Sequence, residues 1–164
     1  MIGRLHHVIV DCPDPAALAA FYSELLGLPV TWQEDDFAVV SASDTTSGIG
    51  FQLAPDFQPP RWPDPARPQQ MHFDVMVDDV QAAEPRVLAL GARRLPGGDS
   101  HSPVYADPAG HPFCLIPRPR WAPLIGPQAG PPIGIPQAGT PPLETPQAGP
   151  SSPRADSPSR RPEP

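Results

Sequence analysis

The clearest periodic pattern in the sequence lies between residues 14 and 27. Apolar side chains recur there at spacings of three and four, which places them on one face of an α-helix. Asp14-Pro15 supplies an N-cap residue followed by proline at the first helical position, and Gly27 provides a stop. We therefore expect a helix from Asp14-Pro15 to Gly27. Its apolar stripe comprises Leu18, Phe21, Tyr22, Leu25 and Leu26.

Short runs of apolar residues around this helix are typical of β-strands. One run, residues 5–10, precedes the helix, and three follow it, at 30–32, 37–41 and 49–54. This order defines a βαβββ unit whose sheet would cover the apolar stripe. The next segment, residues 55–70, contains six prolines and is interpreted as a linker.

The same order of elements occurs again after the linker. Pro85 lies inside the helix of this second unit and should kink that helix or delay its start. The elements expected here are strands at 71–77, 104–106 and 113–116, and a helix that begins at Asp78-Asp79 and runs to Gly91.

Individual residues of the two units also correspond, at offsets of 62–65 positions. We interpret this as an internal repeat of one βαβββ unit, with modules at about 4–55 and 70–117, and expect an α+β domain over residues 1–118. The matching positions are His7 with His72, Asp14 with Asp78, Gly27 with Gly91, and residues 51–55 with 113–117.

Composition separates this domain from the rest of the chain. Of 29 prolines, 14 lie within residues 119–164, together with three copies of Pro-Gln-Ala-Gly that begin at Pro127, Pro136 and Pro146. Such a segment buries too little apolar surface to offset its ordering entropy. We expect residues 119–164 to form a disordered tail.

The charge and the cysteine content indicate which partners and which cellular compartment to expect. The net charge is -7, which disfavours nucleic acid or an anionic membrane as a partner. The apolar runs are far shorter than a membrane span, and no signal sequence precedes the first strand, so we expect a cytoplasmic protein. The two cysteines, Cys12 and Cys114, should be thiols there.

Strand alternation predicts which side chains share a face. His7 alternates with the more apolar set Val8 and Val10, which belongs under the helix, so His7 should lie on the helix-free face, as should His72 in the second unit. His6 competes with His7 for this position. Gln52 and Cys114 occupy equivalent positions on the last strand of each unit. Two units packed about a shared axis would bring His7, Gln52, His72 and Cys114 toward one point.

The order of short motifs resembles the vicinal oxygen chelate superfamily of glyoxalases, extradiol dioxygenases and bleomycin-resistance proteins, most closely its glyoxalase-like branch. The resemblance covers residues 4–117. It implies paired βαβββ modules that form a cup, often in a homodimer, with a divalent metal held by His7, Gln52, His72 and Cys114. The motifs are His7-Val8-Ile9-Val10, Asp14, Phe21-Tyr22, Leu26-Gly27, His72, Val77-Asp78, Asp107-Pro108 and Gly110-His111-Pro112-Phe113-Cys114-Leu115.

The chain departs from that superfamily at two of these positions. Metal-dependent glyoxalases typically carry glutamates where this chain has Gln52 and Cys114, and neither side chain is a strong base near neutral pH. Two imidazoles and a thiolate are still good zinc ligands, and nickel, manganese or iron are the other metals we consider. Asp74, on the face of His72, is the candidate replacement base or fourth ligand, and Asp11 is its looser counterpart in the first unit.

Each of these residues also has an alternative interpretation in which it does not bind a metal. The histidines could line a pocket without metal, Gln52 could do the same, and Cys114 could be a small buried hydrophobic residue. His101 and His111 lie in or beside loops and should be solvated or hydrogen-bond locally. The residues that could form an aromatic wall of a ligand pocket, or else pack in the core or a dimer contact, are Trp32, Phe37, Trp62 and Tyr105.

Three functions fit this sequence. The first is a metal-dependent lyase or isomerase that acts on a small oxygenated molecule chelated by the metal. The second is a metal-free protein that binds and sequesters a small molecule in the cup, as bleomycin-resistance proteins do. A third, less favoured, is an interaction protein whose Pro-Gln-Ala-Gly tail docks to proline-recognising partners.

Overall fold

The computed structural model of the chain describes residues 1–125. The three Pro-Gln-Ala-Gly copies and the disorder expected for them lie outside the described residues. At the end of the described part, Ala122 is buried, and the backbone N–H of Ile125 donates to the Asp78 carboxylate over 3.0 Å. Contacts between the domain and the following chain therefore extend a few residues past residue 118, where the domain was expected to end.

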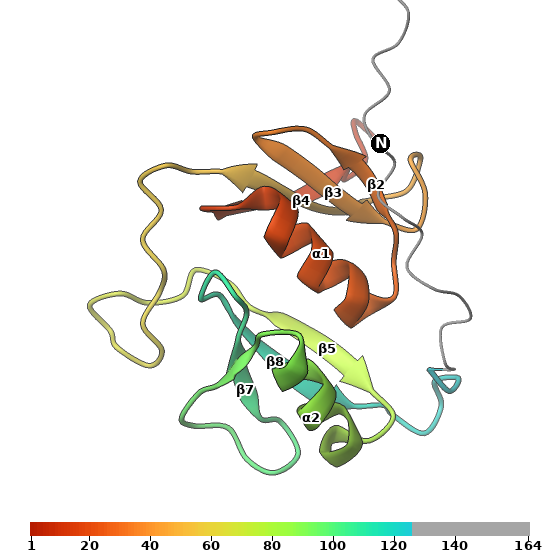
Figure 1. Cartoon of the computed structure of the whole chain (residues 1–164). Coiled ribbons are helices and arrows are strands. Elements are labelled where there is room, and N and C mark those ends of the chain that lie inside the picture. The colour runs from red at the N-terminus through yellow and green to blue at the C-terminus, as the bar shows by residue number, and fades with distance from the viewer. Residues whose placement is uncertain (126–164) are drawn as a thin grey trace, which may run out of the picture.

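The first module is one βαβββ unit (Figure 1). Its sheet has the strand order β1-β4-β3-β2, in which β1 and β4 are parallel and the other pairs are antiparallel. The elements are β1 (His7–Cys12), α1 (Pro15–Leu26), β2 (Val30–Gln33), β3 (Phe37–Ser41) and β4 (Gly48–Leu53).

The second module repeats this topology. Its strand order is β5-β8-β7-β6, again with one parallel pair, β5 and β8. The repeat and the α+β class predicted from the sequence are confirmed. The elements are β5 (Phe73–Val77), α2 (Val80–Ala89), β6 (Arg93–Arg94), β7 (Val104–Ala106) and β8 (Pro112–Pro117).

Helix α1 has the ends that the sequence predicts. The Asp14 side chain accepts a hydrogen bond from the N–H of Ala17 over 2.9 Å, and Gly27 adopts the left-handed conformation, with φ 64°. In α2, Asp79 caps the helix, which begins at Val80 and contains Pro85. Pro85 therefore does not delay the start of α2.

Helix α1 lies between the two sheets, as Figure 1 shows, and joins them in one core. Its Tyr22 ring stacks on Phe51 of β4, with centroids 5.2 Å apart, and meets Phe73 of β5 edge-on at 5.6 Å. Phe21 packs against Phe113 of β8 at 5.9 Å. The helix-covered faces of both sheets thus point inward, toward α1.

The opposite, helix-free faces remain open in the described chain. Along β1, Val10 and Cys12 are buried whereas Ile9 and Asp11 are exposed, which is the alternation predicted from the sequence. In β5, Val75 is buried between the exposed Asp74 and Met76. Each sheet therefore has one face that its own helix does not cover, and this face carries both polar and apolar side chains.

Strand ends differ slightly from those expected. The first strand was expected at residues 5–10, but β1 starts at His7 because pairing with β4 begins there, and Leu5 is exposed. The two-residue strand β6 was not predicted, since a pair of arginines carries no strand pattern. Within the described residues, none of the helices has the length and apolar character needed to cross a membrane.

Candidate metal cluster and ligand pocket

Three potential metal ligands gather on the helix-free face of the second sheet. Asp74 of β5 lies directly opposite Cys114 of β8 in the parallel pair. His72 precedes Asp74 by two residues but lies just before β5, because the strand expected from residue 71 begins at Phe73. The register of β5 and β8 thus positions the carboxylate beside the thiol, and the imidazole of His72 lies close to both.

Distances within this cluster are short. One donor atom from each of His72, Asp74 and Cys114 can be chosen so that all three lie within 4.8 Å of one another. Nε2 of His72 is 3.5 Å from Oδ1 of Asp74. The His72 and Asp74 side chains are about half exposed, at 46% and 61%, so a small molecule could reach them from solvent.

The thiol of Cys114 is held in its neutral form when no metal is present. Desolvation, and then the negative charge of Asp74, raise the pKa of Cys114 above its usual value. A bound cation would offset both effects, because it stabilises the thiolate as a ligand. Ligation by Cys114 would therefore release a proton.

The donor set fits a divalent metal. Zinc binds thiolate sulfur at about 2.3 Å and imidazole nitrogen or carboxylate oxygen at about 2.0–2.2 Å, so ligand atoms around a tetrahedral ion lie roughly 3.3–3.8 Å apart. The separation between His72 and Asp74 is already in that range, and small side-chain rotations would bring Cys114 into it. The fourth coordination position would remain for another ligand or a substrate.

The structure brings together only part of the ligand set expected from the sequence. Among the described residues, the cluster of His72 and Cys114 includes Asp74, the expected replacement ligand, and does not include His7. His7 lies on β1 of the other sheet with its ring centroid 3.8 Å from that of His6. Gln52 is exposed on β4, opposite Asp11.

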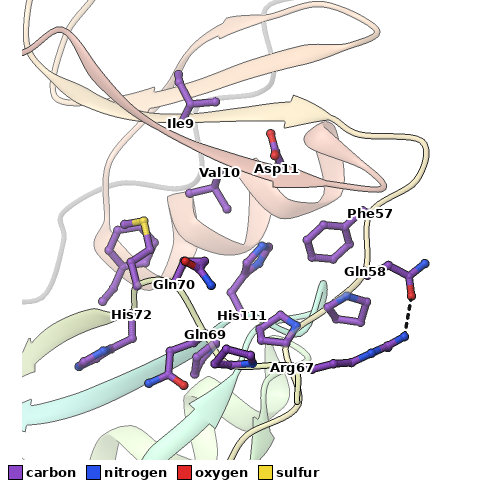
Figure 2. A pocket seen from close by; sticks show the side chains of 16 residues that line it. Ile9, Val10, Asp11, Phe57, Gln58, Arg67, Gln69, Gln70, His72 and His111 are labelled. Carbon is purple, nitrogen blue, oxygen red and sulfur yellow. Dashed lines mark hydrogen bonds between the residues drawn. The ribbon is translucent and has the colours of Figure 1, made fainter. Parts of the chain in front are cut away.

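His7 itself keeps a free lone pair near neutral pH. Desolvation, and then the charge of His6, lower the pKa of His7, so its imidazole stays neutral. Figure 2 shows that Asp11 and His72 point in opposite directions from the region between the modules. Ile9, Asp11 and His72 nevertheless line the same pocket.

A pocket of about 280 Å³ lies between β1, the linker and the turn before β8 (Figure 2). Its wall is largely apolar and contains Val10, Phe57, Met71 and three linker prolines. His111 projects into it, with its ring centroid 5.0 Å from that of Phe57. His72 of the metal cluster also lines this pocket, as do Asp11 and three glutamines.

The four aromatic residues expected to line a ligand pocket are not among the residues that line this one. Trp32 is exposed on β2, and Phe37 lies on β3, where its ring packs over Gly50. Trp62 belongs to the linker, and its Nε1 donates to the carbonyl of Pro96 over 2.7 Å. Tyr105 is fully buried and stacks on Phe113 in the core.

A buried hydrogen-bond network holds His111. Asp107 is fully buried, and its Oδ1 accepts from the backbone N–H groups of Ala109, Gly110 and His111 over 2.8–2.9 Å. Its Oδ2 accepts from the hydroxyl of Tyr22 and lies 3.0 Å from Nδ1 of His111. This local hydrogen bonding of His111 is the one expected from the sequence.

The link to Tyr22 could not be read from the sequence. Tyr22 and Asp107 are 85 positions apart, and the internal repeat offers no equivalent pair. Desolvation and then the charge of Asp107 raise the pKa of Tyr22 far above its usual value, so its hydroxyl stays protonated and donates. The only sequence signal was the Asp107-Pro108 turn followed by Gly110-His111.

Comparison with known proteins agrees with this architecture. A family model described as glyoxalase-like domain matches residues 7–116. A glyoxalase/bleomycin resistance protein/dioxygenase family enzyme from Burkholderia phytofirmans PsJN has a similar structure, with a TM-score of 0.53 and 19% identity over 69% of this chain and 97% of that chain. A search of curated proteins finds no match.

Two further solved structures share the fold. The trypanothione-dependent glyoxalase I of Leishmania major has a TM-score of 0.51 and 18% identity, over 70% of this chain and 86% of that one. The fosfomycin resistance protein FosX of Mesorhizobium loti has a TM-score of 0.53 and 14% identity, over 73% of this chain and 95% of that one. At these identities the likeness establishes the fold alone.

Proposed function

Because this chain belongs to the glyoxalase-like domain family, we propose that it is a divalent-metal-dependent enzyme of the lyase or isomerase type that acts on a small oxygenated molecule. The observation that carries this proposal is the cluster of His72, Asp74 and Cys114, whose donor atoms lie within 4.8 Å of one another. One imidazole, one carboxylate and one thiolate form a donor set suited to zinc, with nickel, manganese and iron as alternatives.

A bound ion would supply Lewis-acid polarisation of a substrate oxygen. The chain's own residues define the rest of the chemistry. Asp74, which is exposed and beside the cluster, can hold the metal or accept a proton from the substrate, whereas the neutral thiol of Cys114 cannot act as a base before it binds the metal. The proton-transfer role that glutamates have in related glyoxalases is therefore assigned to Asp74.

We further propose that a second copy of the chain completes the site. Helix α1 packs against both sheets, and within the described part of one chain His7 is not part of the cluster of His72. A homodimer in which the first sheet of one copy faces the second sheet of its partner would bring His7 and Gln52 near the partner's cluster. Ile9 and Met76, exposed at 44% and 42% on these faces, would be covered in that arrangement.

Cobalt titration tests ligation by the thiol. Thiolate bound to Co²⁺ produces an intense near-ultraviolet charge-transfer absorption, so we expect this band in the parent protein and its loss in Cys114→Ser. Cys12→Ala is the matched control, because Cys12 is fully buried in the core and should leave the band unchanged. A parent protein without the band, or a band that persists in Cys114→Ser, would contradict the proposed metal site.

The second candidate function, metal-free binding of a small molecule, is supported by a different observation. The pocket of about 280 Å³ lies beside the linker and has a mostly apolar wall, which is the usual character of a small-molecule binding site. Such a protein would bind its ligand equally well with and without a chelator. Ligand binding that requires metal would instead favour the enzyme.

A further inference from the structure

We propose that the pocket between β1, the linker and the turn before β8 binds a small phenolic molecule whose hydroxyl donates a hydrogen bond to Nε2 of His111. This pocket adjoins the metal cluster, because His72 is also one of its lining residues, although the His72 ring points away from the pocket in Figure 2. The proposal rests on the hydrogen-bonding state of His111, the lining of the pocket and the order of the linker.

The network around Asp107 fixes which nitrogen of His111 can accept. Both carboxylate oxygens of Asp107 already receive hydrogen bonds, from three backbone N–H groups and from the protonated hydroxyl of Tyr22. The remaining contact, between Oδ2 and Nδ1 of His111, therefore places the proton on Nδ1. In the neutral ring, Nε2 then carries the lone pair and acts as an acceptor.

Nε2 of His111 is available to a ligand. Within residues 1–125 no protein partner reaches this atom, and no buried side-chain nitrogen or oxygen lacks a hydrogen-bond partner, so Nε2 must contact the solvent-accessible space of the pocket. The His111 side chain is only 18% exposed. A ligand hydroxyl would meet an acceptor that is fixed in direction and largely shielded from water, which strengthens the hydrogen bond.

The remainder of the wall favours an aromatic ring. Phe57 lies against His111, and Pro59, Pro60 and Pro68 add flat apolar surfaces on the linker side. The single cation of the lining, Arg67, donates to Oε1 of Gln58 over 3.2 Å and points away from the centre of the pocket in Figure 2. Polar side chains also line the pocket, but the stretch of wall beside His111 is formed by Phe57 and prolines and suits a neutral ring that carries one donor. The other polar lining residues are Asp11, Gln58, Gln69, Gln70 and His72.

The linker is held in place, so the pocket is preformed. Nε1 of Trp62 anchors the linker to the carbonyl of Pro96, and the backbone N–H of Arg61 donates to the carbonyl of Arg67 over 2.8 Å. Pro59 also packs closely on the turn, because a Cβ added at Gly110 would lie 2.9 Å from the Cβ of Pro59. Binding would thus require little ordering of the linker.

Fluorine NMR of the full chain tests this site. 4-Fluorophenol and 4-fluorotoluene have nearly the same shape, but only the phenol can donate to Nε2. We expect His111→Phe to lower the affinity for 4-fluorophenol, relative to that for 4-fluorotoluene, by about five-fold compared with the parent. This is the effect of losing one net hydrogen bond. All titrations contain a chelator, so that a failure of the metal site does not affect the result.

Two variants separate this role from a structural one. Phe57→Ala should weaken both ligands and leave their ratio unchanged, and His101→Ala, which alters an exposed histidine, should change neither. Thermal unfolding verifies that each variant is folded, and His111→Gln replaces His111→Phe if the latter is not. An unchanged ratio in the folded His111 variant, or no binding of 4-fluorophenol by the parent at millimolar concentration, overturns the proposal.

Discussion

Asp74 and Cys114 lie directly opposite each other in the parallel pair of β5 and β8, so the carboxylate and the thiol leave the sheet on the same face. His72 lies just before β5, with its Nε2 3.5 Å from the Asp74 carboxylate. The charge of Asp74 therefore influences the thiol when no metal is present, and this gives a direct test of the arrangement.

Replacing Asp74 with asparagine should increase the reactivity of Cys114. Desolvation is the largest cause of the raised pKa of this thiol and the Asp74 charge is the second, so Asp74→Asn should lower the pKa in part. Alkylation rates measured from pH 7 to pH 11 should shift toward lower pH in the variant. Cys114→Ser identifies the reacting thiol, since burial raises the pKa of Cys12 to about 11 and shields it. Identical profiles for parent and variant would mean that the two groups are not adjacent.

Tyr22→Phe should destabilise the fold by about 1–3 kcal/mol, because it removes a hydrogen bond to a fully buried carboxylate. Urea denaturation at pH 7 measures this loss. The apolar contacts of the ring with Phe51 and Phe73 remain in the variant. A loss below a few tenths of a kcal/mol would show that the hydroxyl does not support Asp107.

The same tyrosine should make stability depend on alkaline pH. The pKa of Tyr22 is raised in the folded state, so its contribution is fully present below its unfolded pKa of 10.0 and is lost as pH rises above that value. The difference in unfolding free energy between parent and Tyr22→Phe should therefore shrink above pH 10. A difference that stays constant up to pH 11 contradicts this linkage.

Gly110→Ala should disturb the linker more than Gly91→Ala does. Both glycines have φ 104°, where alanine is strained by on the order of 1–3 kcal/mol. Only Gly110 is also crowded, since its added Cβ would lie 2.9 Å from Pro59, against 3.7 Å between the Cβ at Gly91 and Pro108. Chemical denaturation should show the larger loss for Gly110→Ala. Equal losses would show that the linker does not pack on the turn.

An arginine on the helix-free face of the first sheet should weaken the proposed dimer. Analytical ultracentrifugation of the parent should show a dimer, and Ile9→Arg should shift it toward monomer, because the charge would be buried between the copies. Leu88→Arg is the matched control, since Leu88 of α2 is exposed to a similar extent, 40% against 44%, but lies outside these faces. A parent that is monomeric at all concentrations would exclude a shared site.

The fold was predictable from local patterns and from the repeat. Asp14-Pro15 and Gly27 bound α1 as expected, and the alternation along β1 and β5 separated buried from exposed residues correctly. These features depend on neighbouring residues, and their duplication in the second module reinforced each inference. The family resemblance on those motifs is likewise confirmed by the match over residues 7–116.

The candidate site was predictable only in part. Strand alternation predicted that His72 and Asp74 lie near each other, and the internal repeat predicted Cys114 on the last strand of the same module. The pocket beside His111 depends on how a proline-rich linker folds back on a distant turn, and no periodic pattern describes such packing. The bond from Tyr22 to Asp107 likewise depends on the packing of α1 against the second module.

The metal content of the untagged full chain, purified without chelator, tests the central proposal most directly. Inductively coupled plasma mass spectrometry should find about one equivalent of zinc, nickel, manganese or iron per chain in the parent. It should find almost none in His72→Ala/Cys114→Ala, a lowered content in His7→Ala/His72→Ala, and the parent's content in the control His101→Ala. No metal in the parent, even after incubation with each ion, or equal metal in parent and His72→Ala/Cys114→Ala, would contradict a metal site at His72, Asp74 and Cys114.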